Sequence, residues 1–227
     1  MSTVGYFVTG TDTGVGKTLF AAALTAALAR RGLRVAVMKP IASGAIRTAD
    51  GLRSEDALAL LAAASVAAPY ETVNPYCFLP PISPHIAAAH AGVRIDLRAL
   101  RTRYDELAAT ADCVVVEGAG GWLAPVAQDV FMADIARVLE VPVILVVGMR
   151  LGCLNHALLT RESIRAHGAS LAGWVANAID PAMACAEENR ATLRAWFGEP
   201  LADIPALGSA GMLPEVSAAA ARLMPRA

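Results

Sequence analysis

The sequence predicts an α/β fold: a P-loop-containing, mostly parallel sheet that is covered by helices on both faces. Apolar segments of strand length alternate with helical segments along the 227 residues, as is typical of parallel sheets. Several predicted strands are apolar at every position, which indicates a sheet buried on both faces. Hydrophobic residues make up 56% of the chain but aromatic residues only 5%, so Ala, Leu and Val must supply most of the core. Because no repeat or flexible linker interrupts the pattern, we expect a single P-loop NTPase-like domain over residues 1–227.

The first quarter of the chain predicts a strand, a glycine-rich loop, a helix and a second strand. Residues 4–9 are mostly apolar and short enough for a strand, whereas the alanine-rich residues 19–31 favour a helix. Residues 34–39 form the second predicted strand. It ends at Pro40, because proline has no N–H to donate to a neighbouring strand.

The middle of the chain continues this alternation. Residues 54–64 predict a helix that has Ser54 as its N-cap and two acidic residues in its first turn. Five prolines within residues 69–84 exclude a long helix and predict an irregular, well-anchored loop. Residues 95–110 have helical periodicity, and residues 112–117 form a strand that runs directly into glycines.

The carboxyl-terminal half repeats the same pattern, with continuous apolar runs between helical segments. The predicted strands are residues 142–147, 171–177 and 201–204, and the predicted helices are residues 131–140, 154–167, 183–197 and 214–224.

The glycine-rich loop between the first strand and the first helix has the pattern of a phosphate-binding loop. It runs from Gly10 to Thr18 and reads Gly-Thr-Asp-Thr-Gly-Val-Gly-Lys-Thr. Glycines let backbone N–H groups surround an anion, and the following helix points its positive end at the same anion. Lys17 is expected to reach the β- and γ-phosphates, and the Thr18 hydroxyl to bind Mg²⁺. The usual first glycine is displaced by one residue, with Thr11 in its place, but the context still predicts a nucleoside triphosphate site.

Acidic and polar residues follow other strands at the edge where the ligands of parallel sheets bind. Glu117 comes after three valines and before glycines, a position that suits a direct or water-mediated contact with Mg²⁺. The alternative is that its carboxylate caps the next turn. Asp56 could add an oxygen to the metal, although acids in the first turn of a helix are favoured in any case by its dipole. Asn177 ends a later strand at the same edge.

Lys39 is a second candidate for the phosphate site. A lysine at the end of a buried strand is costly unless its ammonium group finds anions. Lys17 and Lys39 at one site would match more negative charge than a nucleotide alone carries, as a transferred phosphoryl group and an anionic substrate would. The alternative is that the Lys39 side chain reaches solvent over Pro40.

Composition excludes several other classes of function. The net charge is −1 and no basic block is present, so a nucleic-acid partner is not expected. No apolar stretch reaches the length that spans a membrane, and no signal peptide is expected at the N-terminus. The four cysteines form no C-x-x-C pair and are interpreted as reduced thiols of a cytoplasmic protein. A dinucleotide fingerprint is disfavoured, because Leu19 stands at its third glycine position.

With these residues in place, the chain resembles the dethiobiotin synthetase family over nearly its whole length. The resemblance rests on several separate segments that occur in the same order. They are Tyr6–Thr13 with Val15–Thr18, Lys39–Gly44, Asp56–Leu58, Val73–Tyr76, Ser83–His85, Val116–Gly121, Gly152–His156 and Ala172–Asn177.

The resemblance implies an ATP- and Mg²⁺-dependent ligase of biotin biosynthesis that works as a homodimer. A carbamate forms from 7,8-diaminononanoate and CO₂ and attacks the γ-phosphate of ATP. The second amine captures the resulting carbamic-phosphoric anhydride and closes the cyclic urea, dethiobiotin. Loss of either Lys17 or Lys39 should then cost about 10²-fold or more in rate, by analogy with removing one charge stabiliser.

The resemblance also assigns roles to individual positions. Thr13, Lys17 and Lys39 would be catalytic, and Thr18, Asp56 and Glu117 would hold Mg²⁺. Ser43 would lie by the diamine and its carbamate, and the segment Gly152, Cys153, Leu154 and Asn155 would bind the carboxylate tail of the substrate across a dimer interface. The nucleotide and its metal would contact Gly14, Val15, Gly16, Lys17, Thr18, Leu19, Asp56, Glu117, Gly118, Ala119, Gly120, Asn177, Pro205, Ala206 and Leu207.

Three rival functions stay open on the sequence alone. One is a nucleotide-binding protein without catalysis, but the intact Lys17, Thr18, Lys39 and Glu117 argue against it. A partition or positioning ATPase would carry an extra lysine early in the loop, but no lysine precedes Lys17 there. Such proteins also bind membranes or DNA, for which this chain has neither a basic amphipathic tail nor a basic patch. The nearer rival is a ligase of the same fold that activates carboxylates for amidation.

Overall fold

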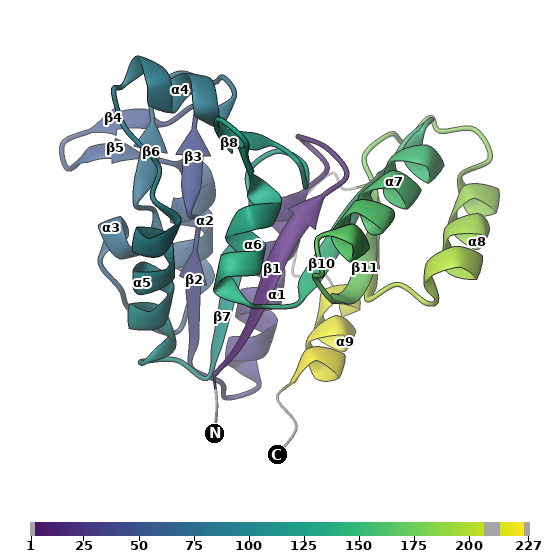
Figure 1. Cartoon of the computed structure of the whole chain (residues 1–227). Helices are drawn as coiled ribbons and strands as arrows, with labels where there is room; N and C mark the ends of the chain where they lie inside the picture. The colour runs from purple at the N-terminus through teal and green to yellow at the C-terminus, as the bar shows by residue number, and fades with distance from the viewer. Residues whose placement is uncertain (1–2, 207–213, 225–227) are drawn as a thin grey trace.

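The computed structural model describes residues 3–206 and 214–224, and a six-stranded parallel sheet runs through its centre (Figure 1). The strand order is β12-β11-β10-β1-β7-β2, and every neighbouring pair is parallel. The strands are β1 (Val4–Gly10), β2 (Val35–Met38), β7 (Cys113–Glu117), β10 (Val143–Met149), β11 (Leu171–Ala178) and β12 (Ala202–Ile204). The expected mostly parallel α/β fold is therefore confirmed.

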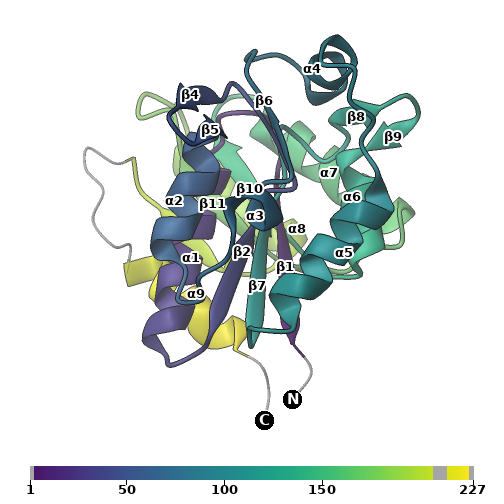
Figure 2. The same cartoon turned by 90° about the vertical axis from the view of Figure 1, so that its left-hand side faces the viewer.

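Helices cover both faces of this sheet, as Figure 2 shows. One face carries α1 (Lys17–Arg30), α2 (Glu55–Ala63) and α9 (Pro214–Leu223). The other face carries α5 (Leu97–Ala108), α6 (Met132–Leu139), α7 (Cys153–Ala166) and α8 (Ala186–Phe197). Ser54 caps α2 as expected, because its side chain accepts a hydrogen bond from the backbone N–H of Ala57.

The sheet is buried because it is covered on both sides. All residues of β2, β7 and β10 are buried, which explains why these strands are apolar at nearly every position. Small residues on α1, such as Ala21 and Ala27, let that helix approach the sheet closely. The apolar content thus serves a core built mainly from Ala, Val and Leu.

The proline-rich segment differs from the expected irregular loop. It contains the short helix α3 (Tyr70–Val73) and the strand β6 (Tyr76–Phe78), which pairs in parallel with β3 (Ile41–Ser43). The helix α4 (Pro84–His90) follows with proline at its first position, where a missing N–H costs nothing. The prolines limit these elements to one or two turns but do not prevent them.

Two antiparallel hairpins also formed that we did not expect. They are β4 (Ile46–Thr48) with β5 (Gly51–Arg53), and β8 (Pro125–Ala127) with β9 (Val130–Phe131). Both lie at the upper end of the molecule in Figure 1, beyond the carboxyl ends of the central strands. Strands of two or three residues carry too little periodicity to be recognised in a sequence.

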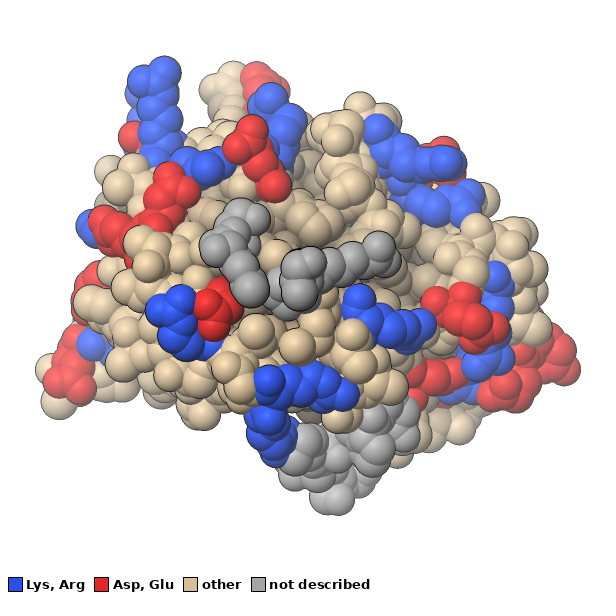
Figure 3. Space-filling view, turned by 90° about the horizontal axis from the view of Figure 1, so that it is seen from below, with Lys and Arg blue, Asp and Glu red and all other residues tan. Residues whose placement is uncertain are grey.

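Strand order brings separate segments of the chain together at this upper edge. β1 lies between β7 and β10, and β2 pairs with β7. The loops that follow β1, β2 and β7 are therefore neighbours, although they lie far apart in the sequence. At the opposite end, acidic and basic side chains are interspersed over the face shown in Figure 3. Within the described ranges, no helix has the length and apolarity needed to cross a bilayer.

Candidate active site

The loop between β1 and α1 has the shape that a phosphate-binding loop requires. Gly14 and Gly16 have φ angles of 74° and 89°, a left-handed conformation that side chains rarely adopt. Gly16 is also the N-cap of α1, and it has no side chain to accept hydrogen bonds from the first amides of the helix. The first amides of that helix are consequently left without intrahelical partners at the edge of a cavity, where an anion could accept from them.

Asn177, near the end of β11, holds this loop by a hydrogen bond from its side chain. Its amide nitrogen donates to the carbonyl of Val15 over 2.8 Å, and its side chain is 5% exposed. A Cβ on Gly16 would lie 2.1 Å from that nitrogen. Gly16 is thus required both by its backbone conformation and by the close approach of Asn177.

Lys39 is buried and lies at the centre of a cluster of charges. Its ammonium group is 2.8 Å from Glu117 Oε1 and 2.7 Å from Asp56 Oδ2, and it donates to the carbonyl of Gly118 over 3.3 Å. All three ammonium hydrogens therefore have acceptors. Because Lys39 is 2% exposed, the alternative that it reaches solvent over Pro40 is wrong.

Burial and the neighbouring charges shift the pKa values of Lys39 and Asp56. Burial alone would lower the pKa of Lys39, but Glu117 and Asp56 outweigh burial and raise it. Burial alone would raise the pKa of Asp56, but the charge of Lys39 and the hydrogen bonds from Lys39 and Thr18 lower it. Lys39 thus carries its positive charge, and Asp56 its negative charge, at neutral pH.

Lys17 is the second cation of the site. It is 7% exposed, and its ammonium group donates to the backbone carbonyl of Asp12 over 3.0 Å. Burial, followed by repulsion from Lys39, lowers the pKa of Lys17 to about 8. The Asp12 side chain is itself paired with Arg150, which follows β10. A phosphate group in the cavity would relieve the repulsion between the two lysines.

Thr18 joins the two carboxylates from the start of α1. Its hydroxyl oxygen lies 2.7 Å from Glu117 Oε1 and 2.9 Å from Asp56 Oδ1. The other carboxylate oxygen, Glu117 Oε2, is buried and has no hydrogen-bond partner among the described residues. An unsatisfied buried oxygen beside a hydroxyl and a second carboxylate fits Mg²⁺, which binds oxygen ligands and keeps several waters or phosphate oxygens. Glu117 therefore faces the cluster and does not cap the following turn.

The site opens into a cavity of about 720 Å³ between the phosphate-binding loop, β3, α2 and the segments that follow β6 and β7. This volume is in the range of small-ligand sites. Half of the residues expected at the site line it. They are Thr13, Gly14, Gly16, Lys17, Thr18, Lys39, Ser43, Asp56, Glu117, Ala119 and Gly120. Asn177 holds the phosphate-binding loop but is not part of the lining.

Several expected residues lie outside this lining. Val15, Leu19 and Gly118 belong to the same loops but do not line the cavity, and Pro205 and Ala206 are exposed after β12. Leu207 falls outside the described residues. The segment of Gly152, Cys153, Leu154 and Asn155 starts α7 and lines neither this cavity nor the second cavity described below.

Sequence reasoning missed one wall of the cavity. Residues 81–84, which link β6 to α4, line it opposite the phosphate-binding loop. Gly44 lies close under this wall, because a Cβ on Gly44 would be 3.3 Å from the side chain of Pro81. The pair of prolines at Pro80 and Pro81 was the available clue, but it indicated rigidity and not a binding role.

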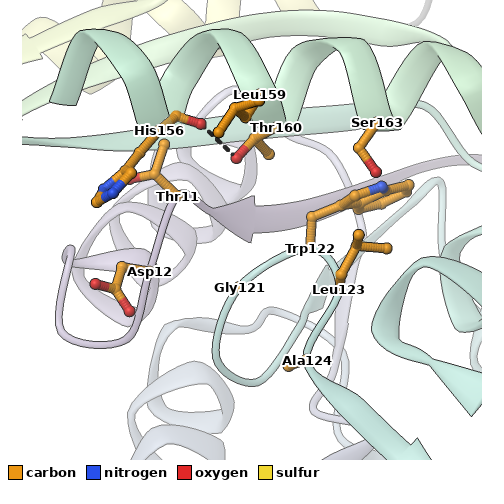
Figure 4. Close-up of a pocket in the computed structure, with 10 residues that line it drawn as sticks. All are labelled: Thr11, Asp12, Gly121, Trp122, Leu123, Ala124, His156, Leu159, Thr160 and Ser163. Carbon is orange, nitrogen blue, oxygen red and sulfur yellow. Dashed lines mark hydrogen bonds between the residues drawn. The ribbon is translucent and has the colours of Figure 1, made fainter. Parts of the chain in front are cut away.

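A second cavity of about 410 Å³ adjoins the first (Figure 4). Thr11 and Asp12 line it on one side, and His156, Leu159, Thr160 and Ser163 of α7 line it on the other. The loop of residues 121–124 forms its floor, and Gly121 and Ala124 line both cavities. The two spaces therefore meet at this loop.

Solved structures show the same fold at low sequence identity. The MinC:MinD cell division protein complex of Aquifex aeolicus matches with a TM-score of 0.58 and 18% identity, covering 90% of this chain and 82% of that chain. The cell division ATPase MinD of Pyrococcus furiosus matches with a TM-score of 0.54 and 17% identity, covering 96% and 97%. At such low identities, the likeness shows a P-loop NTPase fold and does not indicate the function.

Sequence relatives are much closer than these structures. A family model described as an AAA domain matches residues 4–220. The ATP-dependent dethiobiotin synthetase BioD of Pseudomonas aeruginosa (strain UCBPP-PA14) is 52% identical over 207 residues, which are 90% of this chain and 91% of the relative. BioD of Xanthomonas oryzae pv. oryzae (strain PXO99A) is 48% identical over 200 residues, or 88% and 89%. On this evidence, the chain belongs to the family of ATP-dependent dethiobiotin synthetases.

Proposed function

We propose that this protein is a dethiobiotin synthetase, which uses ATP to close a cyclic urea from 7,8-diaminononanoate and CO₂ in biotin biosynthesis. The observation that carries the proposal is the cluster of buried Lys39 and Glu117 with the half-exposed Asp56, beside Lys17 and Thr18. A cavity with two lysines and two carboxylates can hold a triphosphate, its metal and an anionic co-substrate together. Family membership supports the same reaction.

The phosphate-binding loop and α1 would hold the phosphates of ATP. The backbone N–H groups around Gly14 and Gly16 and the ammonium group of Lys17 would contact them. Thr18, Asp56 and Glu117 would hold Mg²⁺. When bound, this ion neutralises charge on the phosphates during transfer.

Lys39, Ser43 and Thr13 line the same cavity as the residues of this metal site, so we assign them to the carbamate. In the reaction, a carbamate oxygen attacks the γ-phosphorus and ADP leaves. The second amine then attacks the carbamoyl carbon and phosphate leaves. Lys39 would stabilise the charge that moves onto these oxygens, in a site where water is largely excluded.

Asn177 would read the adenine base. Since its amide nitrogen already donates to Val15, its carbonyl oxygen is the group we assign to the exocyclic amine of adenine. Pro205, Ala206 and Leu207, after β12, would flank the base. The start of α7, from Gly152 to Asn155, in which Gly152 and Asn155 are exposed and Cys153 is buried, would bind the substrate carboxylate across the interface of a homodimer.

The test is phosphate release from ATP by the purified protein. Release should require the diamine, CO₂ and Mg²⁺ together, and dethiobiotin should form in a one-to-one ratio with phosphate. A Lys39→Ala variant should lose about 10²-fold or more in rate. Release that proceeds without diamine and CO₂ would instead indicate a switch ATPase, and release driven by a carboxylate with an amine would indicate an amidating ligase.

A further inference from the structure

The side chains of Tyr70 and Asn74 connect the two parts of the chain that carry Lys39 and Asp56. Tyr70 starts α3, and Asn74 caps its end. Neither residue lines the cavity. Any effect of theirs on the reaction must therefore pass through other residues.

Asn74 and its neighbour fix the backbone of Lys39. Lys39 lies beyond the end of β2 and before Pro40, so it has no strand partner. Its N–H instead donates to the carbonyl of Val73 over 2.8 Å, and its own carbonyl accepts from the Asn74 amide over 2.6 Å. Asn74 is 2% exposed, so water does not replace these bonds. Both backbone groups of Lys39 are thus held by the end of α3.

Tyr70 fixes the start of α2 in a comparable way. Its hydroxyl oxygen accepts from the backbone N–H of Ser54 over 2.6 Å. Ser54 is the N-cap of α2, and Asp56 lies in the first turn of that helix. The position of the Asp56 carboxylate therefore depends on where Tyr70 places the cap.

The Tyr70 hydroxyl group joins the residue that holds Lys39 to the N-cap of α2. Tyr70 accepts from Ser54 and donates to Asn74 Oδ1 over 2.9 Å. The resulting chain of hydrogen bonds runs from Ser54 through Tyr70 and Asn74 to the carbonyl of Lys39. Arg53 lies over the Tyr70 ring at 4.1 Å and holds its orientation. Burial raises the pKa of Tyr70 to about 12, so its hydroxyl remains a donor at neutral pH.

We propose that Tyr70 and Asn74 are positioning residues that set the separation of Lys39 and Asp56, and through it the geometry of the proposed carbamate and Mg²⁺ sites. The Lys39 ammonium group and the Asp56 carboxylate lie 2.7 Å apart, and both residues line the cavity. A small displacement of α2 against the loop after β2 would change that distance directly. This inference rests on the proposed function for its kinetic test but not for its binding test.

Tyr70→Phe removes the joining hydroxyl and keeps the ring under Arg53. Tyr76→Phe is a matched control, because the Tyr76 hydroxyl also accepts a backbone N–H at a helix N-cap, that of Asp96 before α5. Both changes should lower the thermal midpoint by similar small amounts. Only Tyr70→Phe should lower kcat, by about tenfold, with the KM for ATP within about twofold of the unchanged protein.

Binding of ADP, measured by calorimetry, gives a readout apart from activity. In EDTA, Tyr70→Phe should bind ADP within about twofold of the unchanged protein, because the phosphate-binding loop is untouched. In Mg²⁺, its Kd should rise about fivefold, whereas Tyr76→Phe should show no rise. Loss of ADP binding in both conditions would mean that the loop itself is disturbed, and would overturn the inference.

A second pair of variants tests whether Tyr70 acts through Asp56. In an Asp56→Asn background, adding Tyr70→Phe should reduce kcat by less than about twofold, because the group it positions has been changed. A further tenfold loss would overturn the inference.

Asn74→Asp replaces the donor to the Lys39 carbonyl by an acceptor and should reduce kcat at least about tenfold. Normal turnover of this variant would also overturn the inference. If the unchanged protein releases no phosphate, the proposed function fails while the ADP titrations still decide the positioning role.

Discussion

Replacement of Lys39 by methionine measures the cost of leaving the Glu117 carboxylate buried without its cation. Methionine has a similar length but no charge, so Glu117, which is 1% exposed, loses the ammonium group 2.8 Å away. At an effective dielectric constant of about 20, unit charges at that distance attract by about 6 kcal/mol. Burying the two ions offsets several kcal/mol of this attraction. We expect K39M to lower the free energy of unfolding by about 3–5 kcal/mol, as is usual when one partner of a buried pair is removed.

Glu117→Gln and the double variant separate the charge effect from the packing effect. Asp56 contributes less than Glu117, because its side chain is 45% exposed and water screens it. In K39M/E117Q neither buried charge is left unpaired, so the free energy of unfolding should return to within about 1.5 kcal/mol of the unchanged protein. Activity should not return, since the cation that we assign to the carbamate is still missing.

Unfolding in urea with linear extrapolation gives the stabilities, and phosphate release gives the rates. For a chain of this size, the expected loss corresponds to a thermal midpoint lower by about 10 °C. If K39M were as stable as the unchanged protein, leaving Glu117 unpaired would cost nothing and our electrostatic reasoning would be wrong. If K39M kept normal turnover, the role of Lys39 in the reaction would be wrong whatever its stability.

Three further outcomes follow from the described geometry. Gly16→Ala should weaken ADP binding at least about tenfold in a titration, because its φ of 89° is strained for alanine and the Cβ would meet Asn177; unchanged affinity would contradict the loop geometry. Burial raises the pKa of the Cys113 thiol from 9.0 to about 12. As the pH rises, the thiol is therefore deprotonated in the unfolded chain before it is deprotonated in the folded protein. Urea titrations should then show the free energy of unfolding falling between about pH 9 and pH 12, and falling less in Cys113→Val. Arg150→Ala breaks a half-exposed pair and should change that free energy at pH 7 by less than about 1 kcal/mol.

The succession of strands and helices along the chain could be predicted from the sequence, but the order of the strands within the sheet could not. A continuous apolar run such as that in β10 is typical of a strand in a sheet covered on both faces, and α2 has the expected N-cap, Ser54. The hairpins and the short elements of the proline-rich segment could not be predicted. Their short lengths give little periodicity, and pairing with another strand, such as that of β6 with β3, decides the conformation of the strands among them.

The phosphate-binding loop was also readable from the sequence, because its residues are contiguous and each needs a particular backbone conformation or side chain. The same holds for Lys39 and Glu117, since a charge after a buried strand demands a partner. Which partner each charge finds could not be read in this way. Lys39 and Glu117 are 78 residues apart in the sequence, and only the adjacency of β2 and β7 brings them together.

The sequence by itself determined the fold class, the nucleotide-binding loop and the residues that carry charge into the core. These properties depend on local patterns, which operate over a few residues at a time. Only the tertiary structure decided that Lys39 is shared between two carboxylates, that Asn177 supports the loop, and that Tyr70 joins α2 to the end of β2. Hydrogen bonds and ion pairs act over about 3 Å, so they exist only once folding has set the distance between segments that are remote in the chain.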